Sequence, residues 1–497
     1  MKRGNNMYFF KFCIPLAQGF VSDDMGWFHS SDLTGIGGPP RLHSDHSPNI
    51  EDYRELVRLS KTCGTRIMTA FVMSEADMNS ICGKPQYNRP LAPMDITEYG
   101  TDWHNSVTED QKAIMAYIRE NSACMDFALH GVRHGHFGSG EWEVGEWARR
   151  AKKDEKGNFC EDIKTVTPWD EENITDRLTA ECYRELIRQY YTEEELPFPE
   201  SFVPPNHSYY FEKGKENTTG AVLSQYGVKY CNFKNTGSGS GDYDFDPIVN
   251  WDHNICILDR RGLKNCSYKK TGATPKLPPR PFPWIEVHFN NLWGQTDHFA
   301  KYLYSINRYP ARMLARNTEQ VYSQWLYRNF AKITQKGNSF SIDCTQIPRE
   351  AYDNNILSNI TLKIYLGKRE IETVTGEAEL LGYHKDRYGR GYITLGDSSA
   401  NMGRLHRKIY NFTYKTGRTA PSFYLDTDRS FFSLYGAKDN RISLKVYGTE
   451  TVRIKTEKQH AETRGAKLLD SQYTDGFLCL TLRAKSMLGD TTEILLK

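Results

Sequence analysis

The sequence of 497 residues has few of the features that mark membrane, nucleic-acid-binding or nucleotide-binding proteins. It lacks an apolar run long enough to cross a membrane. It also lacks an excess of one charge, since 64 Lys and Arg residues stand against 62 Asp and Glu residues. A net charge of +2 gives no electrostatic reason to expect a nucleic acid or an anionic membrane as partner. Phosphate-binding glycine loops and the G-x-S-x-G turn of serine hydrolases are absent as well.

The cysteines form no recognisable framework. There are 11 of them, without a C-x-x-C pair, and the odd number leaves at least one unpaired. We expect mostly free thiols, with isolated disulfides still open. Near the N-terminus, Lys11 and Pro15 interrupt an apolar stretch, and no small-residue cleavage site follows it. We therefore expect residues 8–15 to form a first strand rather than part of a signal peptide.

Up to about residue 337, short apolar runs alternate with helical patterns. The apolar run 67–73 follows the helical pattern 51–63, and the run 125–129 follows the pattern 109–120. This alternation is typical of a mostly parallel sheet with βα units, which predicts an α/β fold. Further segments of the same kind are the expected strands 202–203 and 229–233 and the expected helices 173–187, 219–226 and 319–333.

After residue 337 helical periodicity is scarce. Short alternating apolar runs separated by turn residues predict an antiparallel β-sandwich of about 160 residues. Because the chain is longer than one hydrophobic core usually supports, we expect two domains, residues 1–337 and 338–497. The expected strands of the second domain are 340–343, 361–366, 391–395, 408–414, 442–446, 452–454 and 477–482.

Two adjacent aspartates, Asp23 and Asp24, follow the apolar Phe20 and Val21. Neighbouring side chains at a strand end diverge, so one carboxylate can bind a cation while the other faces what the cation activates. Two adjacent carboxylates also repel one another, and a site that keeps both ionised benefits from a cation. The ordinary explanation of an isolated pair is a helix cap or an Asx turn.

Two histidines four residues apart, His130 and His134, come directly after the apolar run 125–129. On a helical turn both imidazoles would lie on one face, where they can share a metal ion. In a βα barrel, active sites lie at the carboxyl ends of the strands. Asp24 with the two histidines therefore predicts a divalent metal site that leaves open positions for water and a substrate oxygen.

Two further segments complete a pattern of four motifs. They are Val203-Pro204-Pro205-Asn206-His207 and Ile285-Glu286-Val287-His288. In order and context, the four segments resemble those of the polysaccharide deacetylases, also called the NodB-homology family or carbohydrate esterase family four. The family motifs read T-F-D-D, H-S/T-x-x-H, R-x-P-Y and L-x-H and lie on a distorted (β/α) barrel. The resemblance spans roughly residues 8–335 and excludes the C-terminal third.

The resemblance implies a role for each matched residue. Asp23 would be the general base, and Asp24, His130 and His134 would hold the metal. His288 would be the general acid that protonates the leaving amine. The family usually uses zinc, with cobalt or nickel as alternatives. The implied reaction is removal of N-acetyl groups from a glycan, in which metal-bound water attacks the acetyl carbonyl.

The resemblance also implies where the substrate binds. A backbone donor near Asn206 would help to hold the oxyanion, and Pro205, His207 and Trp27 are further candidates for substrate or oxyanion contacts. His136 is a candidate metal or substrate contact, because it lies close to the second motif. If the glycan is extracellular, we expect the protein in the cell envelope or outside the cell, and otherwise in the cytoplasm.

Several positions depart from the family pattern. The family arginine, which orients the catalytic aspartate, is matched by Val203 or Pro204, and the family tyrosine by Asn206. Gly131 replaces a Ser or Thr, and Glu286 replaces the leucine of the last motif. Two alternatives to an N-deacetylase therefore stay open: a non-catalytic glycan-binding protein on the same barrel, and an O-acetyl esterase or non-glycan amidase.

Overall fold

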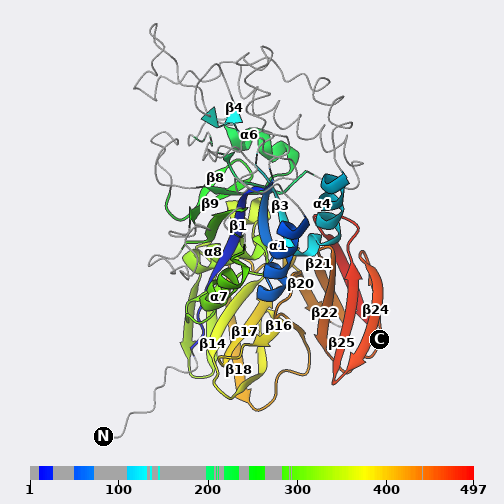
Figure 1. Ribbon diagram of the computed structural model, residues 1–497. Helices are drawn as coiled ribbons and strands as arrows, with labels where there is room; N and C mark the ends of the chain where they lie inside the picture. The colour runs from blue at the N-terminus through cyan, green and yellow to red at the C-terminus, as the bar shows by residue number, and fades with distance from the viewer. Residues whose placement is uncertain are drawn as a thin grey trace, which may run out of the picture.

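The structure combines a closed barrel with three largely antiparallel sheets (Figure 1). It is a computed structural model. The residues that it describes are 11–25, 50–71, 109–130, 135–136, 144–145, 198–205, 209, 211, 218–233, 246–262, 282–289, 292, 294–438 and 440–497.

Seven parallel strands close the barrel. They follow one another in the order β10-β1-β2-β3-β6-β7-β9, and pairing of β9 with β10 closes the ring. The expected (β/α) barrel is thereby confirmed as a fold. The strands are β1 (Leu16–Met25), β2 (Ile67–Phe71), β3 (Met125–Leu129), β6 (Ser201–Phe202), β7 (Tyr230–Phe233), β9 (Ile255–Gly262) and β10 (Trp284–His288). Strand β8 (Asn250–Asp252) pairs with β9, β11 (Arg312–Leu314) pairs with the start of β1, and β4 (Gly135–His136) pairs with β5 (Val144–Gly145).

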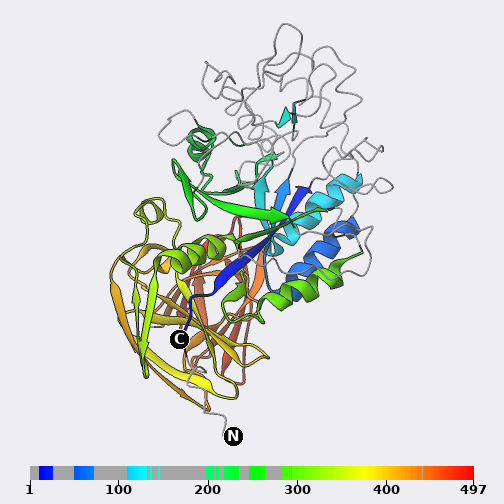
Figure 2. The ribbon, with the colours of Figure 1, turned by 90° about the vertical axis from the view of Figure 1, so that its left-hand side faces the viewer.

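Helices cover the barrel on the side that Figure 2 shows at the right, where α1, α4 and α7 lie beside one another. In α1 the residues Tyr53, Leu56, Val57 and Ser60 are buried, and this spacing is that of one helical face. The helix α8 packs instead between β1 and the C-terminal sheets. The bounds are α1 (Ile50–Cys63), α4 (Glu109–Glu120), α6 (Thr219–Leu223), α7 (Thr296–Ile306) and α8 (Thr318–Phe330). The expected helices 51–63, 109–120 and 219–226 are confirmed, the one expected at 319–333 ends at Phe330, and residues 173–187 lie outside the described residues.

The first strand differs from the expectation. It runs from Leu16 to Met25, whereas residues 8–15 were expected to form it. Proline has no backbone N–H for a ladder, so Pro15 ends the preceding segment instead of lying within the strand. That segment belongs to the C-terminal sheets, because Cys13 forms a β-bridge with Lys363 and the Phe12 ring lies 4.6 Å from that of Phe340.

The C-terminal part forms three sheets, and two of them pack on the third. All the strands expected after residue 337 are present. The antiparallel pairing begins earlier, at Lys332. Gly337, with a left-handed φ of 59°, lies in the turn between the first two paired strands. A division into two domains at residue 337 remains a prediction.

The first sheet has the order β12 (Lys332–Lys336), β13 (Ser339–Asp343), β18 (Ile409–Gly417), β15 (Glu370–Gly376). The second has the order β14 (Ile360–Tyr365), β17 (Arg390–Gly396), β16 (Glu379–Lys385), β19 (Tyr424–Asp426), β22 (Thr449–Lys455), β25 (Phe477–Arg483), β24 (Lys467–Thr474). The third has the order β20 (Ser433–Lys438), β21 (Arg441–Val446), β26 (Asp490–Leu496), β23 (Ala461–Arg464).

The barrel and the sheets share one hydrophobic core. Val21 and Met68 from the barrel, Tyr322 from α8 and Leu362 from β14 belong to the same buried cluster. A second cluster lies between β20, β21 and β26 on one side and β22 and β25 on the other. The C-terminal sheets are therefore packed directly on the barrel. In the described part of the chain the cysteines are free thiols, and no helix is long and apolar enough to cross a membrane.

Candidate functional site

Asp23 and Asp24 lie where the ladder of β1 is irregular. The register between β1 and β2 shifts between Ser22 and Met25, so both aspartates fall within a β-bulge. Asp24 adopts a left-handed φ of 53°, which costs a non-glycine residue on the order of 1 kcal/mol or more. Both side chains are buried. The bulge turns the two neighbouring carboxylates toward one partner, whereas regular strand residues would point to opposite faces.

That partner is His130, which directly follows β3. Its Nε2 lies 2.9 Å from Asp23 Oδ1 and 3.1 Å from Asp24 Oδ1. Its Nδ1 lies 2.7 Å from the carbonyl oxygen of Val203. Because a carbonyl only accepts hydrogen bonds, Nδ1 carries the proton of the neutral ring. The Nε2 lone pair then faces two carboxylate oxygens, an arrangement that calls for a cation between them or a second proton on the ring.

Arg260, on β9, holds the other side of Asp23. Its Nη1 donates to Asp23 Oδ2 at 2.8 Å, and its Nη2 donates to the carbonyl oxygen of Pro204 at 3.3 Å. Burial alone would raise the pKa of Asp23, but Arg260 and His130 outweigh it and hold that pKa well below its ordinary value. Asp23 is therefore ionised and oriented. An arginine from another strand therefore contacts Asp23.

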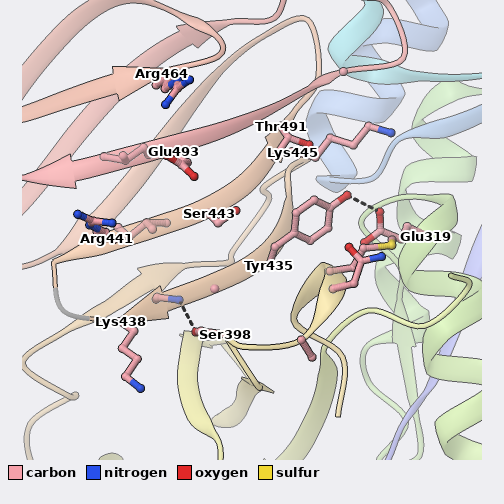
Figure 3. Close-up of a pocket in the computed structure, with 18 of the residues that line it drawn as sticks. Glu319, Ser398, Tyr435, Lys438, Arg441, Ser443, Lys445, Arg464, Thr491 and Glu493 are labelled. Carbon is pink, nitrogen blue, oxygen red and sulfur yellow. Dashed lines mark hydrogen bonds between the residues drawn. The ribbon is translucent and has the colours of Figure 1, made fainter. Parts of the chain in front are cut away.

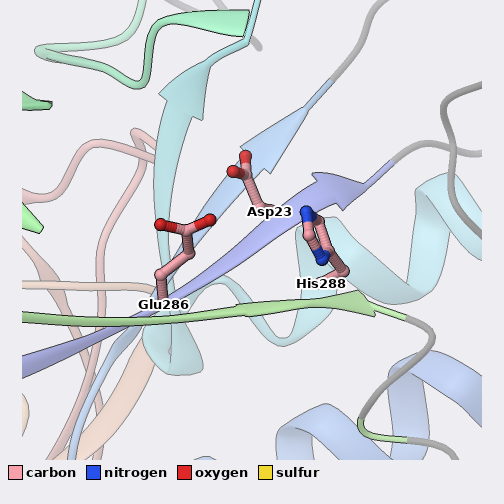
Figure 4. A group of neighbouring side chains, drawn as sticks. All are labelled: Asp23, Glu286 and His288. Carbon is pink, nitrogen blue, oxygen red and sulfur yellow. The ribbon is translucent and has the colours of Figure 1, made fainter. Parts of the chain in front are cut away.

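Strand β10 contributes Glu286 and His288. Glu286 Oε2 lies 3.6 Å from Arg260 Nε, and His288 is paired in register with Asp23. Figure 4 shows Asp23 and Glu286 projecting from the neighbouring strands β1 and β10, with His288 beside Asp23. The His288 side chain is 33% exposed, and its Nε2 lies 3.4 Å from Asp24 Oδ2. His288 is thus the member of the group that is open to a substrate.

Two sets of side chains among the described residues could hold a metal ion. Asp23, Asp24 and His130 form one set, and Asp23, Glu286 and His288 form the other. In the second set the guanidinium of Arg260 lies against both carboxylates, 2.8 Å from Asp23 and 3.6 Å from Glu286. In the first set Arg260 contacts Asp23, and His130 is held in the tautomer that metal binding requires. The first set therefore fits a divalent metal better.

Four of the residues expected from the sequence meet at the carboxyl ends of β1, β3 and β10, namely Asp23, Asp24, His130 and His288. Their roles remain predictions. Pro205 lies buried just after β6. His136 lies on β4. The expected ligand His134 and the expected substrate contacts Trp27, Asn206 and His207 lie outside the described residues.

Arg260 and Glu286 were not predicted as partners of Asp23. A usable signal was present for Glu286, which stands between the apolar Ile285 and Val287, whereas Arg260 stands between the charged Asp259 and Arg261. Charged side chains are almost never fully buried without a partner. A glutamate on a buried strand therefore indicates a partner.

Comparisons with known proteins give little further guidance. No family model matches the chain, and no curated protein matches it. Among solved structures, a GH57 branching enzyme from the hyperthermophilic archaeon Thermococcus kodakaraensis, in complex with glucose, is similar over 61% of this chain and 70% of that chain. The identity is 10% and the TM-score is 0.27. A similarity of this size carries no argument, so the function must be inferred from the site.

Proposed function

We propose that the chain is a metal-dependent hydrolase that removes N-acetyl groups from a glycan. The observation that carries the proposal is the position of His130. Its Nδ1 proton is directed to Val203, and its Nε2 faces Asp23 and Asp24 at hydrogen-bonding distance. The motif resemblance supplies the substrate class, and the geometry supports a cation at this point.

The residues that would hold the metal are Asp24 and His130, with His134 as the third ligand expected from the sequence. Oxygen and nitrogen donors of this kind suit zinc, and they also suit cobalt or nickel. When bound, such an ion polarises a carbonyl oxygen and lowers the pKa of a water molecule. A buried site sharpens this effect, because charges interact more strongly away from bulk water.

Asp23 and His288 would handle the protons. Asp23 is ionised and fixed by Arg260, so it can take a proton from the attacking water. His288 lies on the solvent side of the pair and can protonate the amine that leaves. An amide needs this acid, because its nitrogen is a poor leaving group. Support of Asp23 by Arg260 favours an enzyme over a non-catalytic glycan-binding protein.

The test measures metal content and acetate release on the same protein samples. Asp24→Ala and His134→Ala should lose both the metal and the activity. Asp23→Asn should keep the metal and lose about 100-fold or more in turnover. Asp353→Asn, an exposed carboxylate far from the site in sequence, is the matched control.

The substrate panel pairs N-acetylated with O-acetylated sugars and includes chitooligosaccharides, peptidoglycan fragments and glycosaminoglycans. Acetate release from an N-acetylated member supports the proposal. Release from O-acetylated sugars alone would indicate an esterase. Tight sugar binding without release of acetate from any member would indicate a binding protein, and wild-type turnover by Asp23→Asn would remove the assigned base.

A further inference from the structure

A groove of about 1520 Å³ lies between the barrel and the sheet β20-β21-β26-β23 (Figure 3). On the barrel side it is lined by Glu200, which precedes β6, and by Lys229, which precedes β7. These are the amino ends of parallel strands, so the groove is at the opposite end of the barrel from Asp23. Its volume exceeds the range of about 300–1,000 Å³ that holds a single small ligand. An extended ligand fits it better.

The sheet offers the groove a largely polar face because residues of β21 and β26 alternate between its two faces. In β21, Ile442 and Leu444 are buried in the core, whereas Arg441 and Lys445 line the groove. Strand β26 repeats the pattern, with Ile494 in the core and Glu493 on the groove side. One face of the sheet is therefore committed to packing, and the other is free to bind.

Positive charge gathers at one end of this face. Lys438 lies directly opposite Arg441 in the ladder between β20 and β21, and like charges in this position destabilise a sheet. Among the described residues, no carboxylate forms an ion pair with Lys438 or Arg441, whereas Arg464 lies directly opposite Glu493 in the ladder between β23 and β26. The acid Glu200, by contrast, is neutralised by Lys229 at 2.6 Å and Lys445 at 3.3 Å. An anionic ligand would relieve the repulsion.

The rest of the lining suits sugars. Tyr435 presents a ring in the middle of the groove, and its hydroxyl donates to Glu319 at 2.9 Å (Figure 3). Glu493 is an acceptor for sugar hydroxyls. Single-stranded nucleic acids are bound by several stacked aromatic rings, whereas Tyr435 is the one partly open ring among the described lining residues. The other polar side chains of the lining are Asn355, Ser398, Ser399, Asn401, Ser443, Glu462, Thr463 and Thr491.

We propose that this groove binds an oligosaccharide that carries carboxylate groups. Arg441 and Lys438 contact one sugar carboxylate, Arg464 at the far edge of the sheet contacts a second one, and Tyr435 on β20 packs against a sugar ring on the other side of Arg441. The planar guanidinium of arginine suits the two oxygens of a carboxylate. The inference goes beyond the proposed hydrolase, because the groove contains none of its residues. It also qualifies the expectation drawn from the net charge, which says nothing about how the charges are distributed.

Isothermal titration calorimetry on the full chain tests the proposal. The probes are a hexamer of hexuronic acid without acetyl groups, a neutral hexose hexamer and a single-stranded oligonucleotide of equal charge. The double variant Arg441→Gln, Arg464→Gln should bind the hexuronate about 10- to 100-fold more weakly. Arg441→Lys with Arg464→Lys should recover part of the loss. The matched control, Arg349→Gln with Arg418→Gln, removes two exposed arginines elsewhere and should bind as the wild type does.

Three results would overturn the proposal. They are no binding of the hexuronate, equal binding of the neutral hexamer, and binding of the oligonucleotide as tight as that of the hexuronate. Asp24→Ala separates this inference from the proposed function. It should leave the affinity for hexuronate unchanged, whether or not the wild-type chain releases acetate.

Discussion

Arg260 Nη1 donates to Asp23 Oδ2 at 2.8 Å, although the two residues are 237 positions apart in the chain. Arg260 also donates to the carbonyl oxygen of Pro204, in the segment where the resembling family places its arginine. The Arg260 guanidinium, on β9, therefore lies beside Pro204, in a segment that has no arginine of its own. An arginine thus contacts Asp23 although the third motif has none.

Substitution of Arg260 should lower turnover more than it changes substrate binding. Arg260→Leu leaves Asp23 without its hydrogen bond, and we expect kcat to fall about 100-fold because the carboxylate is no longer held in place. KM should stay nearly unchanged, since Arg260 lies behind Asp23 and is 1% exposed. Arg260→Lys keeps the positive charge but lacks the planar guanidinium, and its kcat should fall about tenfold. Acetate-release kinetics measure both effects.

The neighbour Arg261 provides the control, because it pairs with Asp259 and is 42% exposed. Arg261→Leu should retain wild-type kinetics. Metal content is measured alongside, and it should be the same in all variants. Wild-type kcat in a folded Arg260→Leu protein would show that Asp23 does not depend on Arg260.

Glu286 discriminates between the two sets of possible metal ligands. If the proposed metal lies at Asp24 and His130, Glu286→Gln should keep it, because Glu286 lies against Arg260 and not in that set. Its turnover should fall by no more than about tenfold, since Arg260 keeps its bonds to Asp23 and Pro204. Metal analysis of the purified variant gives the answer. Loss of the metal would place the ion at Asp23, Glu286 and His288 instead.

Sequence patterns were sufficient for the local elements and for the site residues that follow apolar runs. The helices Ile50–Cys63 and Glu109–Glu120 and the strand Met125–Leu129 have clear periodicity, and the chain forms them at those places. His130 could be anticipated because it directly follows that strand. His288 could be anticipated in the same way from the apolar residues before it.

The remaining features depend on contacts between distant strands. Strand β1 has Gln18 and Ser22 among its buried residues, so its apolar pattern is broken and its bounds were misplaced. The bulge at Asp24 arises from the register between β1 and β2, which neither segment specifies alone. The pairing of Arg260 with Asp23 requires the barrel to close, because β9 reaches β1 only through β10. No local pattern contains that information.

The attachment of the C-terminal sheets to the barrel should depend on Arg66. This buried arginine forms an ion pair with Asp126, and its guanidinium lies 3.6 Å from the centre of the Tyr447 ring. Arg66→Met keeps much of the side-chain volume but leaves Asp126 without its cation. We expect the free energy of unfolding to fall by about 3 kcal/mol, as for other buried pairs that lose one partner. Denaturant titration measures it.

Arg54 is the contrasting case. It pairs with Glu51 on the surface of α1, where the two side chains are 52% and 59% exposed. Arg54→Met should cost less than about 1 kcal/mol, because exposed pairs contribute little. Equal losses for Arg54→Met and Arg66→Met would mean that the buried Arg66 contributes no more to stability than an exposed arginine does.

Glu450 should make the stability of this junction depend on pH. Burial raises the pKa of its carboxyl to about 7, although the backbone N–H of Tyr447 and the nearby Arg66 act in the opposite direction. A raised pKa means that the folded chain holds this proton more tightly than the unfolded chain does. The stability that the proton confers is complete below pH 4.5, the ordinary pKa, and is lost as the pH rises through about 7.

Calorimetric melting from pH 4 to 8 should therefore show Tm falling over this window in the wild type. Glu450→Gln, which has no proton to lose, should flatten the fall, whereas Glu457→Gln at an exposed position should leave it unchanged. An unaltered fall in the Glu450→Gln protein would assign the pH dependence to another group.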